Sequence, residues 1–168
     1  PLPEAQLDRF LMHVTITYPT AVEEKSILHL ARNEARESQA TAVADIPNIV
    51  DAQAVFDARS AVLDLYLSDD LEQYLLEIVL ATRNPEAYGE DLAEWLEYGA
   101  SPRATIALDR CARAHAWLNG RDYVGPDDIQ AIAPDVLRHR IILNYEAAAD
   151  GITADHFVTE LIGLIAVP

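Results

Sequence analysis

The sequence is poor in several features that usually identify a class of protein. Among its 168 residues there is one cysteine, Cys111, which leaves no partner for an internal disulfide and no set of thiolates for a zinc site. No apolar run approaches the roughly 20 residues that a membrane-spanning helix needs. We therefore expect a chain with no membrane span, in the reducing environment of a cytoplasmic location.

Positive charge is scarce as well. Lysine and arginine together number 12 against 28 aspartates and glutamates, which gives a formal net charge of −16. Such a field repels phosphate backbones and anionic lipids, and this argues against general binding to nucleic acids or membrane surfaces. Lys25 is the only lysine, so nearly all of the positive charge is carried by arginine. A single well-placed arginine can still meet a nucleotide phosphate.

The familiar catalytic motifs do not occur in the chain. It contains no GxxxxGK[ST], GxGxxG, GxSxG or HExxH pattern. Its five histidines are scattered without the spacing of metal ligands, so no metal site is predicted. Asp127 and Asp128 open a predicted helix, where capping explains the two carboxylates better than acid–base catalysis does. From the residues alone, we expect a helical domain without a catalytic centre.

The first residues predict a helix followed by a strand. The segment Pro3–Arg9 favours a short helix, because proline at a first helical position loses no needed N–H. In the segment Phe10–Thr17 (FLMHVTIT), apolar residues alternate with others, which is typical of a β-strand. A single strand is not stable alone, and the chain begins at Pro1 without an initiator methionine. We therefore expect its partner strands in another part of a larger protein or in another chain.

From residue 20 onward the sequence predicts a bundle of five to six helices. Residues suited to cap helix N-termini occur at five of the starts: Thr20, Asp51, Ser68, Ser101 and Thr153. The predicted helices span residues 20–33, 51–67, 68–83, 101–118, 126–137 and 153–166. We expect connections over residues 34–50 and over residues 84–100, the latter with one short helical turn at 92–96. Tyr123 and Val124 are expected to be extended.

Two segments carry a resemblance to a known family. They are LPEAQLDRF at Leu2–Phe10 and GASPRATIALDRCARAHAWLNGRDYVGPDDI at Gly99–Ile129. Together they resemble the MoxR family of AAA+ ATPases, relatives of the magnesium chelatase ATPase subunits, over essentially the whole chain. The resemblance implies a mainly α fold: the helical-bundle lid domain, preceded by one short helix and one orphan strand of the α/β core. Residues 1–18 would end that core and residues 19–168 would form the lid.

The resemblance gives Arg9, in the motif L-D-R-F, the role of an arginine finger. Such an arginine reaches across a subunit boundary to the γ-phosphate of a neighbour's ATP. Its rigid and always charged fork suits the negative charge that develops in phosphoryl transfer. The alternative, from the local sequence, is an ion pair of Arg9 with Asp8 or Glu4.

Arg103, in the motif A-S-P-R, matches the sensor-2 arginine, which contacts the nucleotide phosphate of its own subunit or of a neighbour. It lies in the first turn of a predicted helix, where the helix dipole disfavours a cation, so we expect an anionic partner. The alternative partner is an acid in the loop Glu90–Glu97. Arg110 and Arg113 follow on the same helix, where a solvated face or ion pairs within the lid are the better interpretation.

The family's phosphate-binding lysine loop (Walker A), its acidic strand end (Walker B) and its sensor-1 residue match nothing in the chain and are expected before Pro1. The chain alone should therefore neither bind ATP tightly nor hydrolyse it, whereas the full-length protein would use ATP and Mg²⁺. The resemblance further implies a ring-shaped homo-oligomer. It would remodel client proteins or insert cofactors or metals into them, often with a partner that carries a von Willebrand A-type domain.

A second class of function remains open at this point. The chain could be a stand-alone acidic helical adaptor that binds a protein partner through a helix groove and needs no nucleotide. The segment Phe10–Thr17 discriminates between the two, since an adaptor has little reason to keep an unpaired strand. Aggregation through its edge would favour the ATPase interpretation.

Overall fold

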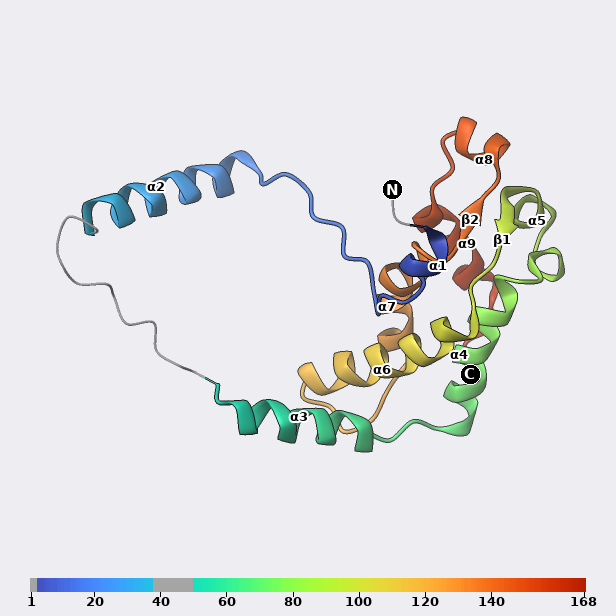
Figure 1. The fold of residues 1–168 in the computed structure, drawn as a ribbon. Helices are drawn as coiled ribbons and strands as arrows, with labels where there is room; N and C mark the ends of the chain where they lie inside the picture. The colour runs from blue at the N-terminus through green and yellow to red at the C-terminus, as the bar shows by residue number, and fades with distance from the viewer. Residues whose placement is uncertain (1–2, 38–49) are drawn as a thin grey trace. The chain divides into compact units, whose positions relative to one another are not determined.

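The computed structural model describes residues 3–37 and 50–168 and is mainly helical in these ranges (Figure 1). The chain divides into two compact units, one of residues Pro1–Val14 with Phe56–Pro168 and one of Thr15–Val55. The elements, in chain order, are α1 (Glu4–Leu7), α2 (Ala21–Glu37), α3 (Ala52–Asp64), α4 (Asp69–Ala81), the 3₁₀ turn η1 (Pro85–Ala87), α5 (Glu90–Trp95), β1 (Leu96–Tyr98), α6 (Pro102–Leu118), α7 (Pro126–Leu137), β2 (Ile142–Leu143), α8 (Tyr145–Ala149) and α9 (Ala154–Leu164). Over these ranges, none of the helices combines the length and apolar character required to cross a membrane.

The predicted helix starts are confirmed by their caps. A side-chain oxygen of each of the five predicted N-cap residues accepts a hydrogen bond from a backbone N–H two or three residues later: Thr20, Asp51, Ser68, Ser101 and Thr153. At α2 the bond is reciprocal, since the Thr20 N–H donates to Glu23 Oε2 at 2.7 Å, as in a capping box. The helix α2 continues past its predicted end because residues 34–37, Glu-Ala-Arg-Glu, are mostly good helix formers. The rest of the connection predicted at 34–50 lies mostly outside the described residues.

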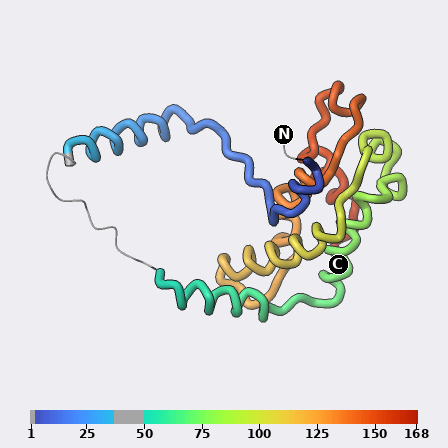
Figure 2. Tube along the Cα trace, in the orientation of Figure 1, coloured from blue at the N-terminus to red at the C-terminus, as the bar shows by residue number. Residues whose placement is uncertain are grey.

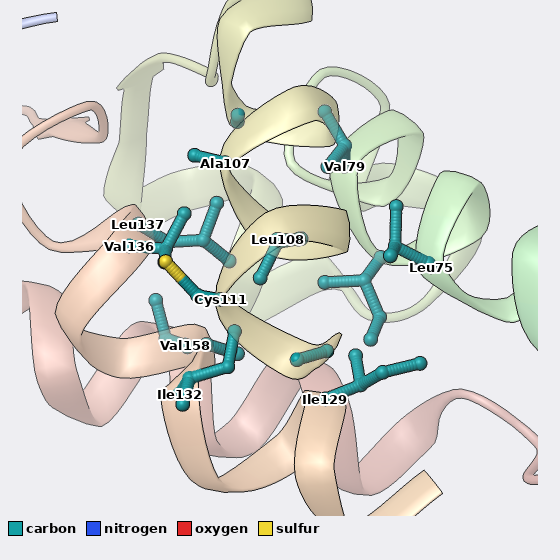
Figure 3. Packing of buried hydrophobic residues seen from close by; sticks show 14 of the residues in the cluster. Leu75, Val79, Ala107, Leu108, Cys111, Ile129, Ile132, Val136, Leu137 and Val158 are labelled. Carbon is teal, nitrogen blue, oxygen red and sulfur yellow. The ribbon is translucent and has the colours of Figure 1, made fainter. Parts of the chain in front are cut away.

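The core of the larger unit lies between α4, α6, α7 and α9. Apolar residues spaced three and four apart place one face of each helix against the others. Figure 3 shows side chains from all four helices meeting there: Leu75, Val79, Leu108, Cys111, Ile129, Val136 and Val158. Burial raises the pKa of the Cys111 thiol, so this cysteine is a small core residue and not a reactive one.

The strand expected at Phe10–Thr17 is not formed. Residues 11–19 have no regular secondary structure, and Ile16 is 91% exposed. A strand is stabilised by hydrogen bonds to a neighbour, and the described part of the chain supplies no neighbouring strand to this segment.

A small sheet was not predicted: its first strand lies in the segment 84–100, where we expected a loop with one helical turn. The strands β1 and β2 pair antiparallel, with Leu96 opposite Leu143 and Tyr98 opposite Ile142. The extended conformation expected near Tyr123 is confirmed by an isolated bridge to Tyr66. Strands of two or three residues give too little alternation to be predicted from sequence.

Candidate functional site

Asp8, which directly precedes Arg9, connects the end of α1 to the start of α6. Arg103 Nη1 donates a hydrogen bond to Asp8 Oδ2 at 2.9 Å. The hydroxyl of Ser101 lies 2.8 and 2.9 Å from the two oxygens of the same carboxylate. The two segments that carry the predicted site residues are therefore joined at one side chain.

In the structure, the Arg103 guanidinium pairs with a carboxylate of the chain itself, that of Asp8. The alternative, an acid in the loop Glu90–Glu97, is wrong, because in the described structure the ion pair of Arg103 is formed with Asp8. Ser101 supports this pair in two ways: its oxygen accepts the N–H of Arg103 at 3.2 Å, and its hydroxyl donates to Asp8. The Arg103 side chain is still 54% exposed, so the guanidinium remains accessible from solution.

The start of α6 is fixed by the residues just before it. Gly99 approaches α4 so closely that a Cβ atom would lie 2.0 Å from the carbonyl oxygen of Thr82, and only glycine fits there. The next N–H, that of Ala100, donates to Thr82 Oγ1 at 3.0 Å, and the Ala100 carbonyl accepts from Arg83 Nε at 2.7 Å. This packing fixes the position of the first turn of α6 and therefore the position of Arg103.

Arg9 is exposed, so its guanidinium can be reached from solution. Its backbone N–H donates to the Gln6 carbonyl at 3.1 Å in the turn that ends α1. Within the described ranges, its guanidinium pairs with neither Asp8 nor Glu4, so the alternative drawn from the local sequence is wrong. The reason is that the adjacent carboxylate of Asp8 already has other cations as partners.

The second of these cations, Arg140, was not singled out from the sequence. Its side chain is 2% exposed, and Nε lies 3.2 Å from Asp8 Oδ1. The same guanidinium donates to the backbone carbonyls of Asp8, Phe10, Leu11 and Val136. No local signal singles out Arg140, because it follows Arg138 and His139 in the sequence and its partners at the end of α1 lie 129 to 132 residues earlier. We refer to Asp8, Ser101, Arg103 and Arg140 as the Asp8 cluster.

The end of α7 also holds the backbone that follows α1. Arg138 Nη1 donates to the His13 carbonyl at 2.7 Å, and the His13 N–H donates to the Asp135 carbonyl at 2.8 Å. His139 Nε2 lies 3.3 Å from the Phe10 carbonyl oxygen. Figure 2 shows the start of the trace passing beside α7, as these contacts require. The main chain on the C-terminal side of Arg9 is thus attached to the end of α7.

The electrostatics of the cluster favour a charged carboxylate. Partial burial works against ionisation of Asp8, but hydrogen bonds from Arg103 and Ser101, with the charge of Arg140, outweigh it and hold the pKa of Asp8 below its usual value. Burial, reinforced by the charge of Arg140, lowers the pKa of His139, so this ring is neutral at pH 7. The cluster therefore carries one negative and two positive charges.

A second acid–arginine group lies at the other end of the α6–α7 pair. Asp128 is fully buried and its Oδ2 accepts the Gly125 N–H at 2.8 Å, which confirms the capping role predicted for it. Its Oδ1 lies 2.6 Å from His115 Nδ1 and also accepts from Arg121. We refer to Asp128, Gly125, His115 and Arg121 as the Asp128 cluster.

The other arginines of α6 differ from Arg103. Arg113 Nε pairs with Asp109 at 2.8 Å and its Nη1 donates to the Leu65 carbonyl, so the ion pair within the lid is confirmed. Arg110 is exposed, two turns along the helix from Arg103.

Among the exposed guanidinium groups of the described residues, those of Arg9 and Arg103 are the two predicted from the sequence to contact a nucleotide. Arg9 and Arg103 suit phosphate oxygens, which guanidinium binds with paired N–H donors. The sequence has no glycine-rich phosphate loop, and the described residues contain no group of three or more His, Cys, Asp or Glu side chains placed to hold a metal ion. This donor set fits a contact to phosphate and is not a complete ATP–Mg²⁺ site.

Comparisons with known proteins agree with this architecture. A family model described as the AAA lid domain matches residues 90–161. The chain is 36% identical over its whole length to Chaperone MoxR1 of Mycobacterium tuberculosis, of which it covers 43%, and 36% identical to the YeaC protein of Bacillus subtilis, of which it covers 48%. A crystal structure of a protein from Cytophaga hutchinsonii matches all of the chain with a TM-score of 0.91 and 39% identity, over 49% of that protein.

The chain thus spans just under half the length of each of these relatives. The similarity extends along the whole chain, and the mainly α lid predicted from the sequence is confirmed. Along its whole length the chain is similar to the C-terminal part of MoxR-type AAA+ proteins, and its residues 90–161 match the AAA lid domain.

Proposed function

We propose that this chain supplies the lid and two phosphate-contacting arginines to a full-length MoxR-type ATPase. Arg9 would act as the arginine finger on the nucleotide of a neighbouring subunit, and Arg103 as the sensor-2 residue. The observation that carries the proposal is the exposed and unpaired guanidinium of Arg9 beside a carboxylate, that of Asp8, which is already engaged by Arg103 and Arg140. Among the described residues, no carboxylate pairs with the Arg9 guanidinium, so a role in stabilising the fold does not account for this arginine.

The contribution of each arginine follows from its surroundings. ATP with Mg²⁺, when bound by the full-length protein, supplies the phosphoryl group that is transferred to water. The exposed guanidinium of Arg9 would stabilise the charge that develops on this group. Arg103 would exchange Asp8 for a phosphate oxygen, because its side chain is half-exposed and the ion pair is open to solvent on one side.

The proposal extends to the protein as a whole. Residues 1–18 would close the nucleotide-binding core and residues 19–168 would form the lid. Subunits would assemble into a ring, because Arg9 would act on the nucleotide of a neighbouring subunit. The protein would be cytoplasmic. ATP use would drive the remodelling of client proteins or the insertion of cofactors or metals, with a von Willebrand A-type domain protein as partner.

Turnover by the full-length protein with Arg9→Ala tests this function. We expect ATP affinity to be largely retained and kcat to fall by roughly 10³-fold or more, the range that arginine fingers supply. Arg110→Ala is the matched control, since it removes an exposed arginine of α6 that lies two turns from Arg103, and it should leave kcat unchanged. Native turnover in Arg9→Ala would contradict the finger assignment.

A further inference from the structure

Arg140 is a buried cation whose hydrogen bonds go mostly to main-chain carbonyls. Its side chain is 2% exposed, and it contacts one carboxylate, that of Asp8. The carbonyl groups that accept from it belong to Asp8, Phe10, Leu11 and Val136. Three of these four carbonyls lie at the end of α1 and in the turn that follows it.

The chemistry of these carbonyls explains why an arginine is used here. The Val136 carbonyl lies in the last turn of α7, and those of Asp8, Phe10 and Leu11 lie beyond the end of α1, so these carbonyls need donors from outside a helix. A guanidinium presents five N–H donors in a fixed plane, so one side chain can serve several carbonyls and a carboxylate at once. Lysine has three donors on one atom and cannot span the same set.

The position of these contacts matters for Arg9. The carbonyls on both sides of it, those of Asp8 and Phe10, accept from Arg140, so the main chain is held while the Arg9 side chain stays exposed. The same guanidinium contacts the Asp8 carboxylate, which in turn contacts Arg103. One buried arginine therefore connects the two residues proposed to touch phosphate.

We propose that Arg140 is a positioning residue for phosphoryl transfer. It holds the main chain on both sides of Arg9 through the carbonyls of Asp8 and Phe10, so that the exposed Arg9 side chain is presented to a neighbouring subunit from a fixed backbone. The role in turnover rests on the proposed function of Arg9, whereas the attachment of the main chain can be tested without it.

Hydrogen exchange of the full-length protein without nucleotide tests the attachment. In Arg140→Lys and in Arg140→Met, we expect the amides of residues 8–13 to exchange at least tenfold faster, while the core amides of α6 keep their protection. Arg113→Lys is the matched control, because Arg113 also contacts a carboxylate and a carbonyl but does not touch this segment. Native protection of residues 8–13 in both Arg140 variants would overturn the proposal.

Steady-state ATPase measurements on the full-length protein test the role in turnover. We expect Arg140→Lys to lower kcat at least tenfold with KM for ATP within twofold of the native value, and Arg113→Lys to change neither. Mixing Arg140→Lys subunits with subunits whose own nucleotide site is inactive, but whose Arg9 and Arg140 are native, should restore turnover. In the mixed assembly, the nucleotide sites of the variant subunits would receive Arg9 from a neighbour whose Arg140 is native. A variant subunit with a misfolded lid could not hydrolyse ATP even with this arginine in place.

The outcomes separate this proposal from the function on which it rests. Native turnover in Arg9→Ala overturns the proposed function itself. Lowered turnover in Arg9→Ala together with native turnover in Arg140→Lys overturns only the role of Arg140. Loss of turnover in Arg140→Lys that mixing does not restore also overturns it, because the defect then lies in the variant's own site.

Discussion

The Asp8 cluster and the Asp128 cluster have the same chemical parts and differ in how far apart those parts lie in the sequence. Each has a carboxylate with two basic partners and a third donor. The partners of Asp128 lie within 13 residues of it, and its side chain is fully buried. The partners of Asp8 lie 93 to 132 residues away, and its side chain is 17% exposed.

The two clusters therefore differ in what they connect: one lies within a single helix pair, and the other joins segments that are distant in the sequence. The Asp128 cluster fastens the loop between α6 and α7, two helices that already pack together (Figure 1). The Asp8 cluster joins the L-D-R-F segment to the starts and ends of helices far along the chain, and one of its arginines, Arg103, stays half-exposed. A cluster with a half-exposed cation between distant segments can respond to a ligand, whereas we expect a local cluster around a fully buried carboxylate to contribute mainly to stability.

Replacing each carboxylate by its amide should give the largest difference. In Asp128→Asn, both oxygens face donors in a closed site, so the amide N–H₂ meets a donor in either orientation, and we expect a loss of about 2–3 kcal/mol in the free energy of unfolding. In Asp8→Asn, the amide oxygen can face Arg140 while the Ser101 hydroxyl turns to accept from the amide N–H₂, and the loss should be about 1 kcal/mol. Urea denaturation measures both, and equal losses would remove the distinction between the clusters.

Removing one arginine from each cluster should change the free energy of unfolding less than the amide replacements do. The two variants should differ instead in how the lid responds to nucleotide. We expect Arg121→Ala to lower the free energy of unfolding by about 1–2 kcal/mol and to leave the effect of nucleotide on the lid unchanged. Arg103→Ala should cost less than about 1 kcal/mol, because its side chain is 54% exposed, yet it should abolish the added protease resistance that an ATP analogue gives the full-length protein. Native nucleotide-dependent protection in Arg103→Ala would contradict the sensor-2 role.

The smallest effect concerns the dependence of stability on pH. The pKa of Asp8 is lower in the folded state than in the unfolded chain, so its ionisation stabilises the fold above the unfolded value of about 3.9. This contribution is lost as the pH falls through the lowered folded pKa. The difference in stability between the native protein and Asp8→Asn should therefore shrink below about pH 4. Denaturation at a series of pH values measures it, and a constant difference from pH 7 to pH 3 would be the contrary result.

Local signals in the sequence predicted most of the helices and their starts. Caps such as Ser101 and Thr153 act within three residues, so their role is visible in the sequence itself. The strand at Phe10–Thr17 failed as a prediction because alternation specifies a tendency, and the partner that would realise it is not among the described residues. The strands β1 and β2 were missed because they are too short to show a period.

The candidate site could be predicted only in part. Arg9 and Arg103 were recognised from motifs, since each lies within a short segment that resembles the family. Asp8 and Arg140 act through contacts between residues 132 positions apart, and no local pattern encodes such a distance. The contacts of Asp8 with Arg103 and Arg140 were therefore not predicted, and the phosphate contacts expected of Arg9 and Arg103 stay predictions.

The most direct measurement is an experimental structure of the assembled full-length protein with a non-hydrolysable ATP analogue. The account predicts the guanidinium of Arg9 within roughly 2.7–3.2 Å of a γ-phosphate oxygen bound to the adjacent subunit, with Arg140 still bonded to the carbonyls of Asp8 and Phe10. An Arg9 side chain remote from every nucleotide in the closed assembly would contradict it.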